Sequence, residues 1–400
     1  MLLPSLILAV TVSTTPFVSD ELASSPVQLF NQYGSVTRAG SVAWTETTGL
    51  LAWTQNNDQP QVFIVPLSPD GHATAAAIAL RFTAGAFTEN AAVATNGRDF
   101  LVAWWQLVLG GLELRALHVD ANGQPLDLAP QSLVPIYAPL AGDGAIPAVA
   151  WTGSGYLVGT SLGFWEVTAD GAHMGGFGAF DSSMANFGAT VDVDQVAMIG
   201  DTPMMVVHSS YKPGGCFAHA CDPPFHFSVL IAASGRGSSY SDSIEKNTHV
   251  PSMACSPSEC LAVWTDGDDG EPGVVVGWFV DASGRPMTPL PRALGGPSRV
   301  PVRAGGSQVA WDGERFLVIW PDLSLGTDTD IVGVYVEPDR TIDPMFTIAA
   351  TPRDERRPFI AAAGSGRVLV GYEVIEGANS RIAGRFVSRH APPPTPRRRP

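Results

Sequence analysis

Four cysteines have the most specific spacing in this sequence, because they form two close pairs. Cys216 and Cys221 bound the stretch "CFAHAC", and Cys255 and Cys260 bound the stretch "CSPSEC". An even number of cysteines in close pairs favours disulfides made in an oxidising compartment. Two histidines lie near the first pair, and such a set of ligands could bind zinc, but its spacing matches no known zinc motif. We therefore predict two local disulfides.

Two acidic stretches follow tryptophans, "TDGDDGEPG" after Trp264 and "PDLSLGTDTD" after Trp320. Carboxylate oxygens are the ligands that Ca²⁺ prefers, and glycines allow a loop to fold around an ion. The spacing is not that of an EF-hand loop, so a solvated acidic surface is the alternative. We expect no other cofactor. The candidate calcium ligands are Asp266, Asp268, Asp269, Glu271, Asp328 and Asp330.

One serine matches a nucleophile pattern. The stretch "GTSLG" (Gly159–Gly163) fits G-x-S-x-G, in which Ser161 would be the nucleophile of a hydrolase. That motif requires a helix directly after the serine, whereas the following residues, "FWEVTADG", have the pattern of a strand. We predict no catalytic residue here.

The composition limits the classes of partner and of fold. The chain has 400 residues and a net charge of −15, and an acidic surface repels the phosphates of nucleic acids. Hydrophobic residues make up 45% of the chain, which is enough for a large core. Gly (42) and Pro (33) are frequent, so turns and short strands are expected in place of long helices. Nucleic acid is therefore not an expected partner.

The two ends of the sequence differ from the rest. The apolar run Leu2–Val12 has the length of the core of a signal peptide, and Ala23-Ser24 would suit cleavage, although no Lys or Arg precedes the run. We predict a signal peptide over residues 1–24 and a secreted or cell-envelope protein, with no transmembrane segment in the mature chain. Residues 390–400, "HAPPPTPRRRP", predict a disordered Pro/Arg tail.

A short strand pattern recurs along the chain. The stretch "WDGERFLVIW" (Trp311–Trp320) has a turn followed by an apolar run with an aromatic end, and similar runs return about every 50 residues. Such a period is typical of a solenoid or a propeller. The seven runs end at Trp53, Trp104, Thr160, His208, Trp264, Trp320 and Tyr372.

Each repeat contains the signals for four strands. A short apolar strand and a tight turn precede the recurring run, and a third and a fourth strand follow it, separated by a Gly turn as at Gly123 and Gly284. Four strands per repeat predict an all-β fold, a seven-bladed β-propeller over residues 25–389. The recurring tryptophans are expected to pack between blades. The last repeat lacks an outer strand, and Ser25–Gly34 is the spare strand that we expect to close the ring.

The stretches "AWDGERFLVIWPD" and "DIVGVYV" resemble the repeat of uncharacterised secreted bacterial β-propeller proteins. The resemblance extends over residues 25–389 in its period, and the third, fourth and seventh repeats depart from the pattern. It implies a propeller fold and export, and it implies no catalytic residues.

The loops between the second and third strands vary most in length, and variable loops on a rigid scaffold often carry function. We predict an exported, monomeric, non-catalytic propeller that binds a protein or glycan through the loops of blades 4–6. Alternatives are a propeller-type carbohydrate-active hydrolase or lyase and a purely structural cell-surface module. The candidate contacts are Tyr211, Phe217, Phe225, Asp266, Asp268 and Asp269.

Overall fold

The computed structural model describes most of the chain, with gaps that fall mainly between strands. All structural statements below refer to these described residues. They are residues 16–27, 40–55, 61–80, 88–108, 111–137, 146–160, 163–170, 173–177, 190–211, 226–233, 242–244, 251–266, 273–288, 292–295, 305–323, 328–377 and 379–389.

The described residues form seven antiparallel sheets, and each repeat of the sequence supplies one of them. We number these sheets as blades 1 to 7. Blade 1 contains β3 (Ser41–Trp44), β4 (Gly49–Gln55), β5 (Gln61–Leu67) and β6 (Ile78–Ala79). Blade 2 contains β7 (Thr88–Thr95), β8 (Phe100–Val108), β9 (Gly111–Val119) and β10 (Gln131–Tyr137). Blade 3 contains β11 (Ala148–Trp151), β12 (Gly155–Thr160), β13 (Gly163–Thr168) and β14 (His173–Phe177).

The remaining blades follow the same plan. Blade 4 contains β15 (Thr190–Ile199), β16 (Thr202–Tyr211), β17 (His226–Ala233) and β18 (Asp242–Ile244). Blade 5 contains β19 (Ser252–Cys255), β20 (Cys260–Asp266), β21 (Val274–Val280) and β22 (Arg292–Ala293). Blade 6 contains β23 (Gln308–Trp311), β24 (Phe316–Asp322), β25 (Asp330–Val336) and β26 (Phe346–Ala349). Blade 7 contains β27 (Glu355–Ala362), β28 (Arg367–Glu376), β29 (Asn379–Ser388), β1 (Phe17–Val18) and β2 (Leu22–Val27).

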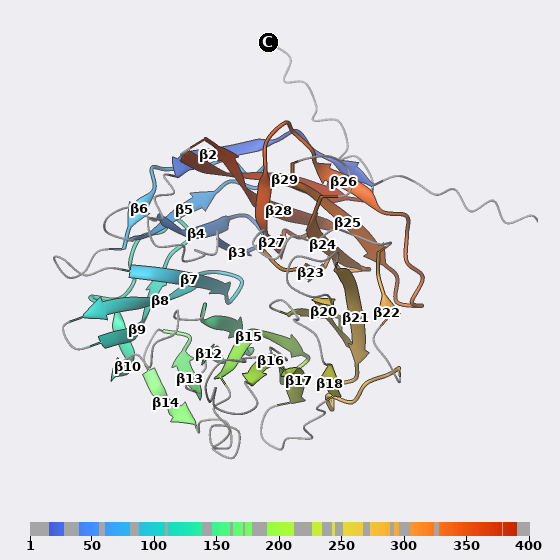
Figure 1. Ribbon diagram of the computed structural model, residues 1–400. Coiled ribbons are helices and arrows are strands. Elements are labelled where there is room, and N and C mark those ends of the chain that lie inside the picture. Colours follow the sequence, from blue (N-terminus) through green and yellow to red (C-terminus); the bar gives the residue numbers. More distant parts are fainter. Residues whose placement is uncertain are drawn as a thin grey trace, which may run out of the picture.

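The blades surround a common axis, as Figure 1 shows, so the fold is the predicted β-propeller. The first strand of each blade is innermost: β3, β7, β23 and β27 lie near the centre of the view, and β6, β10, β14 and β22 lie at its periphery. Innermost strands of consecutive blades also contact one another. Within a blade each strand pairs with the next along the chain, which keeps the connections short.

The two sides of the disc differ in their connections. One side, the turn side, carries the tight turns between the first and second strands of each blade and, in blades 1, 2, 5 and 6, the turns after the third strand. In blade 6, for example, Asp312 Oδ1 accepts the N–H of Arg315 at 2.7 Å. The third-to-fourth turns place Gly123 at φ 75° and Gly284 at φ 76°, a backbone conformation that favours glycine. The opposite side, the loop side, carries the links between blades and the second-to-third connections, which vary from two residues in blades 2, 3 and 7 to 14 residues in blade 4.

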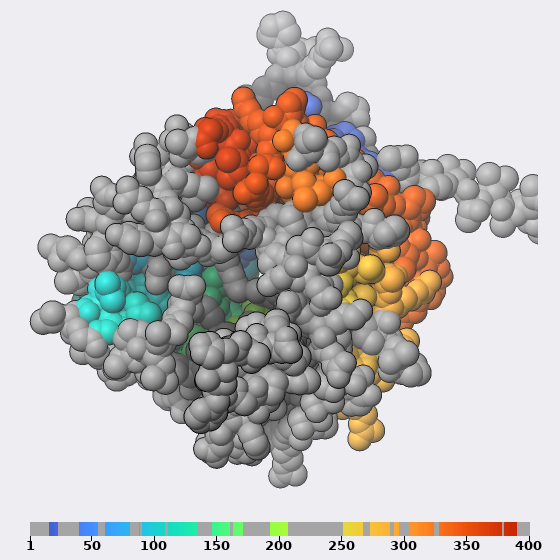
Figure 2. Space-filling view, viewed as in Figure 1, coloured from blue at the N-terminus to red at the C-terminus, as the bar shows by residue number. Residues whose placement is uncertain are grey.

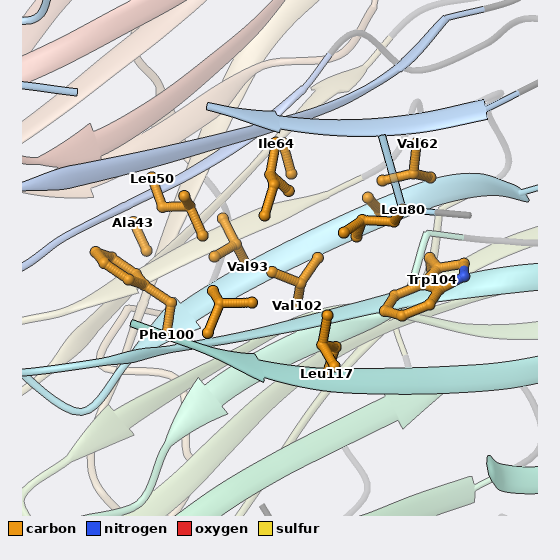
Figure 3. Packing of buried hydrophobic residues seen from close by; sticks show 13 residues of the cluster. Ala43, Leu50, Val62, Ile64, Leu80, Val93, Phe100, Val102, Trp104 and Leu117 are labelled. Carbon is orange, nitrogen blue, oxygen red and sulfur yellow. The ribbon is translucent and has the colours of Figure 1, made fainter. Parts of the chain in front are cut away.

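Hydrophobic side chains fill the space between consecutive blades and divide the core into seven clusters. Figure 3 shows the cluster between blades 1 and 2, where Ile64 and Leu50 of blade 1 face Val102 and Trp104 of blade 2. Trp104, like its equivalents Trp264 and Trp320, is fully buried. The prediction that the recurring tryptophans pack between blades is confirmed, and each of these rings stabilises the fold by about 2–3 kcal/mol.

Polar side chains also connect the innermost strands. Ser41 Oγ accepts the N–H of Val93 from the next blade at 3.0 Å. Ser252 Oγ likewise accepts the N–H of Val309 at 3.2 Å and donates to Gln195 Oε1 at 2.8 Å, so one hydroxyl joins three blades. These bonds satisfy backbone N–H groups that a curved ring of strands would otherwise leave without partners.

The N-terminal segment completes blade 7, because β1 and β2 both pair with the outer edge of β29. Phe17 lies opposite Ser388, and Val27 lies opposite Ser380. The expected closure by an N-terminal strand is thus confirmed, but the closing segment begins earlier than the predicted Ser25–Gly34, at Phe17, and overlaps it at residues 25–27. Residues 28–34 lie outside the described residues. The predicted signal-peptide boundary, at Ala23-Ser24, falls within β2.

Among the described residues no helix is long and apolar enough to cross a membrane.

Candidate functional site

Carboxylates gather on the loop side of blade 6. Asp322 is the last residue of β24 and lies directly opposite Asp330, the first residue of β25. Both are buried, with relative exposures of 0% and 7%, and Asp328 lies just before β25. The antiparallel register therefore places two acidic side chains as a cross-strand pair, an arrangement that like charges disfavour.

A fourth carboxylate comes from blade 7. Glu355 is the first residue of β27, is 0% exposed, and accepts a hydrogen bond from the hydroxyl of Thr351. Its own N–H donates to the carbonyl oxygen of Thr329 at 2.8 Å, and the N–H of Thr329 donates to Asp354 Oδ1 at 3.0 Å. These bonds join the loop before β25 to the start of β27. We call Asp322, Asp328, Asp330 and Glu355 the acidic cluster.

Burial and mutual repulsion perturb the cluster. Loss of hydration on burial raises the pKa of Glu355 from 4.5 to about 7, against the opposing effect of the Thr351 hydrogen bonds, and the charges of Asp330 and Glu21 add to the rise. Burial also raises the pKa of Asp330, and the charges of Asp322 and Asp328 raise it further. A carboxyl with a pKa of about 7, such as that of Glu355, can hold or release a proton at physiological pH.

The cluster contrasts with the other buried acids of the same sector. Glu373 of β28 is 3% exposed, but it pairs with Arg357 Nη1 at 2.8 Å and accepts the hydroxyl of Ser380 at 2.8 Å. Among the described residues no Lys or Arg forms an ion pair with Asp328, Asp330 or Glu355. A cationic or hydrogen-bond-donating ligand can therefore contact the cluster at Asp328, which is its partly exposed member.

The other predicted contact residues fall into two groups. Asp266 ends β20 and Tyr211 ends β16, so both lie on the loop side, as expected from the repeat. Phe217, Phe225, Asp268, Asp269 and Glu271 lie outside the described residues. Within the described part of the chain no three His, Cys, Asp or Glu side chains are arranged to hold a metal ion.

One of the two predicted disulfides is confirmed. Cys255 and Cys260 are cross-strand partners at the ends of β19 and β20 and are disulfide-bonded. In blade 6 the same position holds the aromatic pair Trp311 and Phe316, with ring centroids 4.7 Å apart. The disulfide thus takes the place of an aromatic contact beside the tight turn. Cys216 and Cys221 lie outside the described residues.

Two further features bear on catalysis. Ser161 lies outside the described residues, and β13, a strand, begins two residues after it at Gly163, where a nucleophile elbow would have a helix. A cavity of about 30 Å³ lies between blades 7 and 1, and its lining, which includes Leu22, Phe359 and Gly371, contains no acidic residue. The cavity therefore forms no site with the acidic cluster.

The sequence analysis identified Asp328 and Asp330 among the candidate calcium ligands but missed Glu355. The only local signal was the charged run "RDERRP" directly before an apolar strand. Glu355 joins the cluster because blade 7 packs against blade 6. This contact brings together residues that belong to different repeats of the sequence. In the space-filling view the described residues of these two blades appear in orange to red, in separate patches on the upper and right-hand parts of the molecule (Figure 2).

Comparisons with known proteins found similarities among solved structures. No family model matches this sequence. No curated protein matches it either. Among solved structures, a Trypanosoma rangeli sialidase in complex with the inhibitor DANA is 11% identical, with a TM-score of 0.49 over 92% of this chain and 60% of that chain. The chain thus spans about three fifths of the length of that sialidase.

Two further structures are similar in the same way. The β-propeller domain of the Trilobed protease from Pyrococcus furiosus, which has an open velcro topology, is 9% identical, with a TM-score of 0.43 over 86% of this chain and 97% of that domain. A mutant of NanB sialidase from Streptococcus pneumoniae is 11% identical, with a TM-score of 0.47 over 91% of this chain and 71% of that chain. At these identities the similarity is one of fold.

Proposed function

We propose that this protein is an exported, monomeric, seven-bladed β-propeller that binds a protein or glycan through the loop side of its disc and catalyses no reaction. The acidic cluster is the observation that carries the proposal. It concentrates negative charge on the loop side, where the second-to-third connections vary most in length, while the tight turns of the turn side are closed by backbone hydrogen bonds. A rigid scaffold with variable loops on one side is the usual arrangement of a binding surface.

The chemistry of the cluster restricts the partner. Carboxylates accept hydrogen bonds from Lys and Arg side chains and from sugar hydroxyls, and they repel phosphates and sulfates. Asp328 is partly exposed and is the member of the cluster that a ligand can reach without a rearrangement of the blades. The proposed partner is therefore a protein with a basic patch or a neutral glycan, contacted at blade 6 and by the predicted loop residues of blades 4 and 5.

A binding experiment tests this function. The purified protein is screened against immobilised neutral and acidic glycans and basic proteins, with and without calcium, and each hit is measured with the double variant Asp328→Asn/Asp330→Asn. We expect a loss of affinity of roughly tenfold, which is about 1.4 kcal/mol. The matched control is Glu46→Gln/Glu314→Gln, which removes two exposed charges from the turn side. Equal losses in both variants, or none in either, would argue against the loop side as the binding surface.

A carbohydrate-active hydrolase or lyase is the second candidate, and the buried carboxyls of the cluster are the observation that favours it. Glycosidases use two carboxyls, one of which has a raised pKa, and burial raises the pKa of Glu355 to about 7 near Asp330, whose pKa is also raised. Glu355 is fully buried, however, so it would reach a substrate only if the loop before β25 moved. Hydrolysis of any polysaccharide in the same panel, abolished by Glu355→Gln, would establish this function over the first.

A further inference from the structure

The N-terminal segment is held to blade 7 by more than the pairing of its backbone. Ser19 donates its N–H to the carbonyl oxygen of Phe386 at 2.9 Å, and its hydroxyl accepts the N–H of Phe386 at 2.9 Å. The carbonyl oxygen of Ser19 accepts a hydrogen bond from Arg385 Nη1 at 2.9 Å. Ser19, in the short link between β1 and β2, is therefore bonded through both its backbone and its side chain.

Glu21 makes the strongest contacts of the segment. Its Oε1 accepts a charge-assisted hydrogen bond from Arg381 Nη2 at 2.6 Å, and its Oε2 accepts the hydroxyl of Tyr372 at 3.1 Å. Both partners belong to blade 7, and Tyr372 is fully buried in the cluster between blades 6 and 7. Without Glu21, Arg381 would keep only its contact with Glu376, which lies at 3.0 Å from its Nε.

Leu22 connects the segment to the first blade. It packs in the cluster between blades 7 and 1, and a Cβ at Gly71 of blade 1 would lie only 2.4 Å from Leu22 Cδ1. Gly71 also has φ 85°, so the turn at this point requires glycine for its backbone and leaves space for Leu22. The segment thus closes the ring where the last and first blades meet.

We infer that export processing, if it is to leave this fold intact, hydrolyses a peptide bond between Val12 and Phe17 and not the predicted bond near Ala23-Ser24. Water is added across one peptide bond, which releases the apolar leader and creates a new α-amino group just before β1. The small and polar residues Ser13, Thr14 and Thr15 follow the apolar run and suit such a cleavage site. This inference rests on the proposed export and is independent of the proposed ligand binding.

Analysis of the exported protein tests the position of the cleaved bond. The full chain is produced in a bacterium that exports it, and the exported fraction is analysed by intact mass and N-terminal sequencing. A first residue between Ser13 and Phe17 is the expected result. An exported chain that starts after Phe17 or that retains Met1 would overturn the inference, whereas the absence of exported protein would refute the proposed export on which it rests.

The melting temperature tests the structural premise separately from export. A chain that starts at Phe17 should melt about 10 °C or more above one that starts at Ser25, because the shorter chain lacks the contacts of Ser19, Glu21 and Leu22. Within the longer chain, Glu21→Gln should lower the melting temperature by several degrees, whereas the matched variant Asp20→Asn, at an exposed position, should not. Equal melting of both chain lengths would show that the segment is dispensable and would overturn the inference.

Discussion

Replacement of Glu355 by Gln should change how the stability of the protein depends on pH. The carboxyl of Glu355 is fully buried at the start of β27, and burial raises its pKa from 4.5 to about 7. In the unfolded chain the same carboxyl titrates at its ordinary value. The folded state therefore binds a proton that the unfolded state has lost at any pH between these two values.

The sign and the size of the effect follow from this difference. Below pH 4.5 the carboxyl is neutral in both the folded and the unfolded state, so its full contribution to the free energy of unfolding is present. As the pH rises through 7, this contribution is lost. A rise from pH 5 to pH 8 should lower the free energy of unfolding through this group by about 2–3 kcal/mol. Glu355→Gln removes the titration while its amide oxygen can still accept the Thr351 hydroxyl, so the variant should gain stability relative to the native protein at pH 8 and little at pH 5.

Equilibrium urea unfolding at pH 5, 6, 7 and 8, followed by tryptophan fluorescence, measures this difference. The control is Glu314→Gln, which removes an exposed glutamate from the turn side and should leave the pH dependence of the native protein unchanged. Other buried acids, such as Glu373, also titrate in both proteins, so the comparison isolates Glu355. If Glu355→Gln and the native protein lose stability in parallel between pH 5 and 8, the raised pKa assigned to the buried Glu355 carboxyl is wrong.

Three further perturbations test other parts of the structure. The double variant Cys255→Ala/Cys260→Ala should lose about 2 kcal/mol of stability, and a reductant should lower the melting temperature of the native protein but not that of the variant. Arg340 has φ 74° at a turn position where other blades have glycine, and it pairs with the buried Glu259 at 2.5 Å. Both Arg340→Ala and Arg340→Gly remove this ion pair, but only glycine adopts the backbone conformation without strain, so the alanine variant should be less stable by about 1 kcal/mol. Equal stabilities of the two variants in urea unfolding would refute the assigned strain. Because the acidic loops lack the spacing of a known calcium motif, millimolar Ca²⁺ should leave the melting temperature unchanged, and a rise that Asp268→Asn abolishes would instead identify a calcium site.

The sequence alone determined the repeating architecture, because its signals are local. Turn residues such as Asp312 and Gly284 recur at fixed offsets from apolar runs, and the structure places each at a tight turn. The burial of Trp264 and Trp320 follows from the same period, since a repeated aromatic residue must lie at the same depth in every blade. The Cys255–Cys260 disulfide was also predictable, because its two residues flank one hairpin turn.

Only the tertiary structure decided which distant residues meet. The start of the closing strand could not be predicted from the sequence, because the outer edge of β29 could pair with any extended segment. The contacts of Glu21 and Leu22 hold Phe17–Val27 at this edge, so the closing segment begins before the predicted Ser25–Gly34. The acidic cluster depends likewise on the packing of blade 7 against blade 6, which brings Glu355 near Asp330 and removes water from both. Hydration and charge at a buried group are set by neighbours from other blades, so a period of the sequence predicts the blade but not the chemistry between blades.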